Sequence, residues 1–191
     1  MMHNTEVRCS WCGEDKAYQD YHDNEWGVPC RDDKRLFEFL ILESAQAGLS
    51  WLTILRKREN YRSAFDNFDV QRVASYDDTD IQRLMADTGI VRNRLKIESA
   101  ITNAQCFIRL QSELGSFSNY LWGFVDHRPV VNNWTNEFQI PAYTDLSDRI
   151  SKDMKVRGFK FFGTTICYAY LQAMGVVNDH IIGCLYRPVS C

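Results

Sequence analysis

The sequence has no apolar run long enough to cross a membrane, because Lys, Arg, Asp or Glu interrupts each of its longest apolar stretches. Residues 1–6 carry neither the basic region nor the apolar core of a secretory signal. Positive charge is not in excess either. The formal net charge is −3, so binding to a nucleic acid would need a local basic patch. We therefore expect a cytoplasmic protein that binds no membrane.

Strand-like alternation of apolar and polar residues is also missing, and the run 129–131 is too short to build a sheet. The 191 residues contain no internal repeat, and their number is ample for a hydrophobic core. Capping residues and apolar spacing instead predict an all-α protein, with caps at Asp32 or Asp33, at Ser50, and at Asp78 or Thr79. The expected helices cover residues 18–26, 33–47, 51–58, 61–65, 70–75, 78–88, 93–114, 119–125, 145–158 and 166–174.

Disulfides are not expected, because the number of cysteines is odd, at seven, and the cytoplasm keeps thiols reduced. Cys9 with His22, and His180 with Cys184, form Cys-x12-His and His-x3-Cys half-sites near the two ends of the chain. Two thiolates and two imidazoles suit tetrahedral zinc, and four protein ligands leave no open position, so one zinc ion would be structural. Two alternatives stay open: Cys12 replaces Cys9 or His22 as a ligand, or the thiols and imidazoles bind nothing.

Residues 18–26 concentrate large aromatic side chains. Tyr18, Tyr21, His22 and Trp26 are spaced so that a short helix would place them on one broad face, which could simply dock on a core. Glu43 lies in the otherwise apolar and small run 42–48, near the end of a predicted helix. It could be a solvated carboxylate at that helix end.

Basic residues cluster around a predicted helical hairpin. One helix stops at Gly89, a short turn follows, and the next helix begins near Asn93, with basic residues at Arg92, Arg94 and Lys96. Backbone N–H groups at such a helix start bind phosphate, although an ordinary hairpin with a solvated basic edge has the same pattern. A second basic group, which precedes a possible anion-binding helix start at Thr164 and Thr165, comprises Lys155, Arg157 and Lys160. The run 56–58 is expected on the exposed side of its helix.

Four motifs together resemble the DNA-3-methyladenine glycosylase I family. They are the runs 21–29, 43–51 and 158–165, and the group Asn178, Asp179, His180 and Cys184. The resemblance extends from Cys9 to Cys184 and implies a helix-hairpin-helix DNA glycosylase fold in one domain, residues 1–191. It places the hairpin at about 79–114 and the zinc-binding segments at 9–22 and 180–184. The implied zinc ligands are Cys9, His22, His180 and Cys184, with Cys12 uninvolved.

The same resemblance implies the activity and its residues. The protein would hydrolyse the N-glycosidic bond of 3-methyladenine in double-stranded DNA after flipping the base, leaving an abasic site and free 3-methyladenine. Glu43 would act at the base, inside a pocket of Tyr18, Tyr21, Trp26 and Trp51. A gap-filling loop would carry Gly48 and Leu49. The remaining DNA contacts would come from Gly89, Arg92, Arg94, Lys96, Lys160, Thr164 and Thr165. The protein is expected to be a monomer.

Three positions depart from the wider superfamily. The Schiff-base lysine of the bifunctional members falls at Asn93, and their catalytic aspartate falls at Gln111. No strand-cutting lyase activity is therefore expected. Val91 replaces the second hairpin glycine. Two rival functions remain: a non-catalytic, zinc-stabilised DNA-binding module, and an enzyme that uses one of the free thiols.

Overall fold

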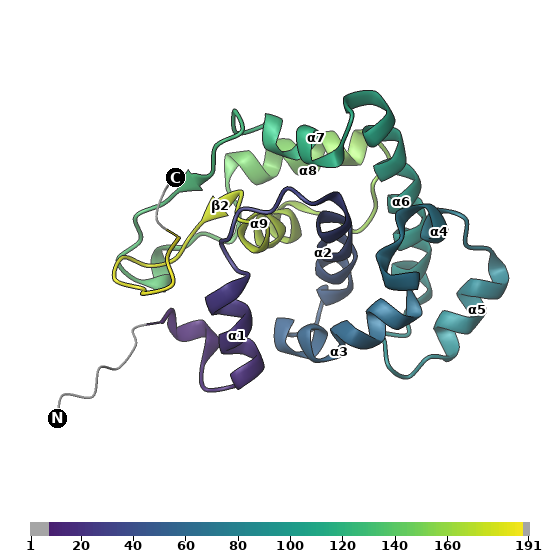
Figure 1. Cartoon of the computed structure of the whole chain (residues 1–191), viewed down its shortest axis with the longest axis horizontal. Coiled ribbons are helices and arrows are strands. Elements are labelled where there is room, and N and C mark those ends of the chain that lie inside the picture. The colour runs from purple at the N-terminus through teal and green to yellow at the C-terminus, as the bar shows by residue number, and fades with distance from the viewer. Residues whose placement is uncertain (1–7, 189–191) are drawn as a thin grey trace.

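The computed structural model describes residues 8–188, and its central element is α2 (Asp33–Gln46). Helix α2 packs against α3 (Trp51–Ala64), α6 (Arg94–Leu114), α7 (Phe117–Gly123) and α9 (Thr164–Ala173), as Figure 1 shows. Residues 36–45 are buried without interruption, so α2 is enclosed on every side and not along one stripe. Most of these buried residues are apolar, and a helix with apolar side chains on all its faces is stable only in such a position.

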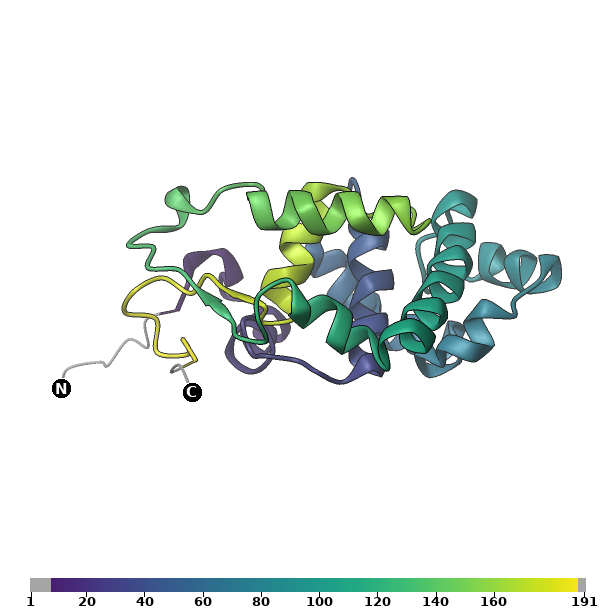
Figure 2. The same cartoon turned by 90° about the horizontal axis from the view of Figure 1, so that it is seen from above.

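The other elements form the two ends of an elongated molecule. Helices α4 (Val70–Ala74) and α5 (Asp78–Ala86) lie with α6 at one end, and α1 (Lys16–Asn24) lies at the other beside the C-terminal segment, as Figures 1 and 2 show. The remaining elements are η1 (Ser10–Cys12), η2 (Asp66–Phe68), β1 (Val130–Val131), η3 (Glu137–Gln139), α8 (Asp145–Val156) and β2 (Val177–Asn178).

The prediction of a mainly helical protein is confirmed, with local corrections. Val130–Val131 and Val177–Asn178 form a short parallel pair, so the expectation of no strand is wrong. Residues 61–64 continue α3 and do not form a separate helix. The N-cap of α5 is Asp77, whose side chain accepts hydrogen bonds from the backbone N–H of Thr79 and Asp80. This geometry satisfies two orphaned helix donors, which a cap at Asp78 or Thr79 would not do.

In the part of the chain that the structure describes, no helix has both the length and the apolar character required to span a bilayer. The expectation that residues 1–6 carry no signal concerns a segment outside the described residues.

The segment that follows α1 is held closely against the end of α9. The backbone N–H of Gly27 donates to the carbonyl of Gln172 at 2.9 Å, and that of Cys30 donates to the carbonyl of Met174 at 3.0 Å. Gly175 has a φ of +63°, and a Cβ on it would lie 2.3 Å from the carbonyl carbon of Val28. Only glycine fits this contact, because both the dihedral angle and the space exclude a side chain.

We expect Gly175→Ala to reduce the free energy of unfolding by about 3 kcal/mol or more, because two backbone segments would have to separate. The matched control is Gly123→Ala at the end of α7, where a Cβ meets nothing within 4 Å. That change should be neutral or stabilise the protein by up to about 1 kcal/mol. Urea denaturation measures both variants, and equal stabilities would contradict the role given to Gly175.

Candidate functional site

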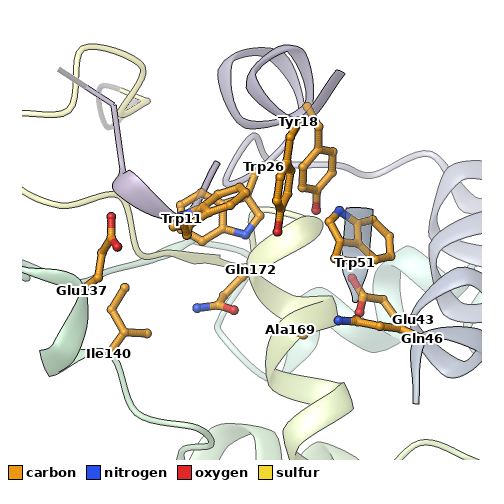
Figure 3. A pocket seen from close by; sticks show the side chains of 11 residues that line it. Trp11, Tyr18, Trp26, Glu43, Gln46, Trp51, Glu137, Ile140, Ala169 and Gln172 are labelled. Carbon is orange, nitrogen blue, oxygen red and sulfur yellow. The ribbon is translucent and has the colours of Figure 1, made fainter. Parts of the chain in front are cut away.

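A pocket of about 370 Å³ opens between the N-terminal elements, the end of α2 and α9, as Figure 3 shows. Its volume is at the small end of the range found for ligand pockets and suits a flat molecule of the size of one nucleobase. The lining combines aromatic rings with a few polar side chains. The lining residues are Trp11, Tyr18, Tyr21, Trp26, Glu43, Gln46, Trp51, Glu137, Ile140, Ala169 and Gln172.

All five residues predicted for the base pocket line this one cavity, although they come from α1, α2, α3 and the segment after α1. The rings of Tyr21 and Trp51 lie 5.4 Å apart at 51°. Phe39 supports both from behind, with centroid distances of 6.3 Å to Tyr21 and 5.9 Å to Trp51. If the face of Tyr18, Tyr21 and Trp26 only packed on the hydrophobic core, these rings would not line a cavity.

Trp11 is a pocket residue that the sequence analysis missed. It lies in η1, and its ring contacts those of Tyr18 at 5.0 Å and Trp26 at 4.9 Å. The available signal was its position between Cys9 and Cys12, in a segment that the sequence analysis already considered for a functional site. Glu137 and Ile140, from the loop around η3, were also unforeseen.

Glu43 is only 3% exposed, yet it has no charged partner inside the pocket. Loss of hydration disfavours the ionised carboxylate and raises the pKa of Glu43 to about 8. The carboxyl group therefore holds its proton at neutral pH. Glu43 is thus not the solvated carboxylate that its place near a helix end allowed.

Three buried side-chain atoms within residues 8–188 have no hydrogen-bond partner in the protein, namely Trp11 Nε1, Glu43 Oε2 and Trp51 Nε1. All three belong to residues that line this pocket. A buried polar atom without a partner costs about 1–3 kcal/mol, so such atoms are rare and need an explanation. Two N–H donors and one carboxyl oxygen, set among aromatic rings, are suited to bind a flat heterocycle with polar edges.

A buried ion-pair network lies behind the aromatic rings. Arg58 is 8% exposed, so the expectation that residues 56–58 face solvent is wrong at this position. Its guanidinium donates to Glu25 at 2.7 Å and to Glu38 at 2.7 Å, and it lies 4.9 Å from the ring centroid of Phe39. The network joins the segment after α1 to α2 and α3, and it fixes the ring that supports Tyr21 and Trp51.

Cys9, His22, His180 and Cys184 form a buried cluster whose ligand atoms all lie within 4.8 Å of one another. Cys9 Sγ is 3.8 Å from His180 Nδ1, and Cys184 Sγ is 3.3 Å from His180 Nδ1 and 3.6 Å from His22 Nε2. Metal–sulfur bonds of about 2.3 Å and metal–nitrogen bonds of about 2.0 Å separate tetrahedral ligand atoms by about 3.3–3.8 Å. The three quoted distances fall in this range, and the cluster as a whole could hold a metal ion. The Cys12 thiol lies outside it and donates to the carbonyl of Cys9 at 3.1 Å.

The second nitrogen of each cluster imidazole faces an oxygen atom. His22 Nδ1 lies 2.8 Å from Asp23 Oδ1, and His180 Nε2 lies 2.9 Å from the carbonyl oxygen of Trp26. These oxygens favour the tautomers that direct an unprotonated nitrogen into the cluster, an arrangement typical of metal-binding histidines. Because Trp26 lines the pocket, the cluster is also connected to the pocket wall.

The loop after α2 carries two of the predicted DNA contacts. Gly48 has a φ of +81°, and Leu49 is 42% exposed although it is a leucine. Lys96, which was predicted to contact phosphate, directs its ammonium into this loop. It donates to the carbonyls of Ala45 at 2.8 Å and Ala47 at 2.6 Å. Partial burial lowers the pKa of Lys96.

The turn between α5 and α6 carries the predicted residues Gly89, Arg92 and Arg94. Arg92 and Arg94 are exposed, and Arg94 forms an ion pair with Glu98 at 3.1 Å. The N–H of Gly89 donates to Asp87 at 2.7 Å, so this N–H already has a protein acceptor.

The remaining predicted contacts lie between α8 and α9. Lys160 and Thr165 are exposed, whereas the Thr164 hydroxyl lies 3.1 Å from that of Ser147. Asn103 fixes the backbone of Lys160 through hydrogen bonds of 2.8 and 3.0 Å.

Asn93 and Gln111 have structural contacts and lie outside the pocket lining. Asn93 caps α6, since its side chain accepts a hydrogen bond from the N–H of Lys96. Gln111 donates to Asp33 at 2.8 Å, at the opposite end of α2 from Glu43.

Known structures with this arrangement are DNA glycosylases. The crystal structure of a 3-methyladenine DNA glycosylase I matches with a TM-score of 0.93 and 48% identity, covering 95% of this chain and all (100%) of that one. A structure of the Staphylococcus aureus enzyme, which concerns its recognition of 3-methyladenine, matches with a TM-score of 0.94 and 38% identity. It covers 97% of this chain and 99% of that one. The chain therefore has the fold of a helical DNA glycosylase.

Sequence comparison identifies the family. The family model of methyladenine glycosylases matches residues 11–187. DNA-3-methyladenine glycosylase 1 of Escherichia coli is 50% identical over 181 residues, which are 95% of this chain and 97% of that protein. The Haemophilus influenzae DNA-3-methyladenine glycosylase is 45% identical over 178 residues, covering 93% and 96%. The chain belongs to the methyladenine glycosylase family, and the resemblance noted in its motifs is confirmed.

The raised pKa of Glu43 predicts a stability that depends on pH. Between the ordinary value of 4.5 and about 8, the folded protein holds a proton that the unfolded chain has lost. Stability conferred by the neutral carboxyl is fully present below pH 4.5 and is lost as the pH rises to about 8. Glu43→Gln stays neutral at every pH. Its free energy of unfolding should therefore rise relative to that of the wild type across this pH window, by at most on the order of 5 kcal/mol.

Urea denaturation of both proteins at pH 5, 6.5 and 8 measures this gain. A difference in unfolding free energy that stays constant across the three pH values would contradict the raised pKa.

Proposed function

We propose that this protein acts in base excision repair, as a DNA glycosylase that hydrolyses the bond between 3-methyladenine and deoxyribose in double-stranded DNA. Its products would be free 3-methyladenine and an abasic site. The observation that carries this proposal is that three unsatisfied polar atoms belong to Trp11, Glu43 and Trp51, which line one aromatic pocket. Membership of the methyladenine glycosylase family and the names of the Escherichia coli and Haemophilus influenzae relatives support it.

The charge of the damaged base explains the composition of the pocket. Adenine methylated at N3 in DNA is cationic, and its glycosidic bond is already weakened. Stacking and cation–π attraction to Trp51 and Tyr21 contribute about 0.5–2 kcal/mol in a desolvated site. Glu43 would accept a hydrogen bond from the exocyclic amine and, once it has lost its proton, stabilise the positive charge. An uncharged adenine gains less from both interactions, so it would be bound weakly.

We assign the catalytic role to Glu43 and base binding to Tyr18, Tyr21, Trp26 and Trp51. Water would attack C1′ while the bond to the base breaks. The electron pair of that bond neutralises the leaving base, and the attacking water releases a proton to the solvent. No strong general base is required, because binding the base in a dry pocket stabilises the charge distribution of a labile bond. Asn93 and Gln111 have structural contacts in place of a lysine and an aspartate, which supports hydrolysis without strand cleavage.

Binding of the duplex would involve α5, its turn and α6, which we assign as the helix-hairpin-helix at about 79–114. Arg92 and Arg94 are exposed there and can contact phosphates. Leu49 would insert into the gap left by the flipped base and offset part of the lost stacking, which costs on the order of a few kcal/mol. Phosphate contacts between α8 and α9 would come from Lys160, Thr164 and Thr165. The active species would be a cytoplasmic monomer.

We assign one structural zinc ion to Cys9, His22, His180 and Cys184. Three separations of 3.3–3.8 Å between the ligand atoms and the oxygen partners of both imidazoles support this assignment. The ion would join the segments 9–22 and 180–184, so that η1 and α1 present Trp11, Tyr18 and Tyr21 to the pocket. Four protein ligands leave the metal no position for substrate, and its contribution would be to stability.

Glu43→Gln should reduce the single-turnover rate of 3-methyladenine release from methylated duplex DNA by about 100-fold, because the amide cannot stabilise the cationic base. The zinc content should not change. Glu59→Gln on the exposed face of α3 removes a carboxylate and serves as the control. An unchanged rate in Glu43→Gln would remove Glu43 from the mechanism. Wild-type protein that binds methylated DNA but frees no 3-methyladenine would support the non-catalytic binding module.

The same assay tests the thiol-dependent alternative. Alkylation of the thiols outside the cluster should leave base release unchanged, whereas loss of activity would favour that alternative.

His180→Ala should lose its zinc, and its midpoint of thermal unfolding should fall by on the order of 10 °C. Elemental analysis should find about one zinc per chain in the wild type and in the exposed control His127→Ala. Stoichiometric zinc in His180→Ala would disprove the ligand assignment.

A further inference from the structure

Lys96 connects two elements that the proposed function uses for different purposes. It belongs to the first turn of α6, beside the turn that carries Arg92 and Arg94. Its ammonium donates to the carbonyls of Ala45 at 2.8 Å and Ala47 at 2.6 Å, at the end of α2. Both distances are those of good hydrogen bonds. Two of the three ammonium donors are therefore already engaged within the protein.

The end of α2 needs such a partner. The last carbonyls of a helix find no N–H donor within that helix. At the C-cap Ala47 the backbone is no longer helical, with φ −45° and ψ 113°, so the chain leaves the helix direction there. Gln46 is satisfied separately, since its carbonyl accepts the N–H of Leu49. Lys96 thus provides hydrogen bonds to the two carbonyls on either side of Gln46. Its positive charge also complements the negative end of the helix dipole.

The segment that Lys96 holds connects two residues of the pocket lining along the chain. Glu43 lies just before it on α2, and Trp51 lies just after it at the start of α3. Between them lie Gly48, with its positive φ, and the exposed side chain of Leu49. Ser50 then caps α3. Apart from Lys96, the hydrogen bonds found for residues 47–50 are short-range ones within 46–54.

We infer that Lys96 is a positioning residue, which holds the loop 47–50 in a fixed position relative to the α5–α6 turn. Docking of that turn on the DNA backbone then sets where Leu49 meets the duplex. Extrusion of the base depends on this placement, whereas recognition of a base already in the pocket does not. The inference rests on the proposed function, and it replaces the phosphate contact expected for Lys96 from the sequence.

The test is Lys96→Met, which keeps the length of the side chain and removes the donors. The control is Lys34→Met in the first turn of α2, an exposed lysine about 17 Å along the same helix from Ala45. Three quantities are measured for each protein. They are single-turnover base release from methylated duplex DNA and from the same DNA after strand separation, the Kd for free 3-methyladenine, and the salt dependence of binding to a duplex with a stable abasic-site analogue.

Lys96→Met should release base from the duplex at least about tenfold more slowly, because small misplacements of a positioning group have large effects on rate. Release from separated strands and the Kd for free 3-methyladenine should stay within about twofold of the wild type, since no paired base must be extruded. The slope of log Kd against log salt concentration should not change. Lys34→Met should match the wild type in all three.

Equal losses on duplex and separated strands, or no loss, would overturn the inference. So would a salt slope reduced by about 0.9, which is the signature of one lost phosphate contact. If Lys96→Met does not fold, as judged by loss of a cooperative urea-unfolding transition, Lys96→Gln is measured in the same way, because its neutral amide can donate to only part of the carbonyl pair. A folded Lys96→Met that no longer binds free 3-methyladenine would also overturn the inference. Failure of the proposed function is distinguishable, because wild-type protein would then free no 3-methyladenine from either substrate.

Discussion

The desolvation of Glu43 is the constraint on which the site depends. Helix α2 is buried on all sides, so a carboxyl near its end lies in a place from which water and countercharges are largely excluded. Burial raises its pKa to about 8, so the free protein contains a neutral acid in a pocket that is also lined by two tryptophans with unsatisfied N–H groups. A cationic base would supply the positively charged partner that an ionised Glu43 lacks in the free protein. The proposed selectivity for an alkylated purine follows from this unpaired carboxyl more than from the shape of the pocket.

The aromatic part of the pocket depends on contacts that lie outside it. Arg58 with Glu25 and Glu38 holds the ring of Phe39 behind Tyr21 and Trp51. On the other side, the Cys and His cluster joins the two ends of the described chain next to Trp11 and Trp26. Rings supported on both sides cannot collapse onto one another. This explains how a cavity with aromatic walls persists in a protein whose interior is otherwise close-packed.

The proposed sites of base recognition and of duplex binding lie on different elements of this fold. The pocket lies between η1, α1, α2, α3 and α9, whereas the basic turn between α5 and α6 lies toward the other end of the elongated molecule. The loop 47–50 lies between pocket residues in the sequence, and the hydrogen bonds of Lys96 connect the start of this loop to the helix that follows the basic turn. A glycosylase needs such a connection, because phosphate contacts fix where the protein lies on the duplex. A rigid link then also fixes the position of the residue that fills the gap left by the flipped base.

Much of the fold followed from the sequence, because the signals were local, whereas the predicted pocket residues followed from the family resemblance of the motifs. Apolar spacing and capping residues located most helices. The His-x3-Cys spacing located half of the Cys and His cluster, because a tight turn between the two residues, which the structure has at 182–183, can bring both side chains together. The motifs established the family. Only the tertiary structure decided that Trp11 and Glu137 reach the pocket, that Arg58 is buried, and that Lys96 binds the carbonyls of Ala45 and Ala47. Each of these facts depends on contacts between residues far apart in the chain. No local periodicity encodes such contacts, because burial and hydrogen bonding across elements are determined by how the helices pack.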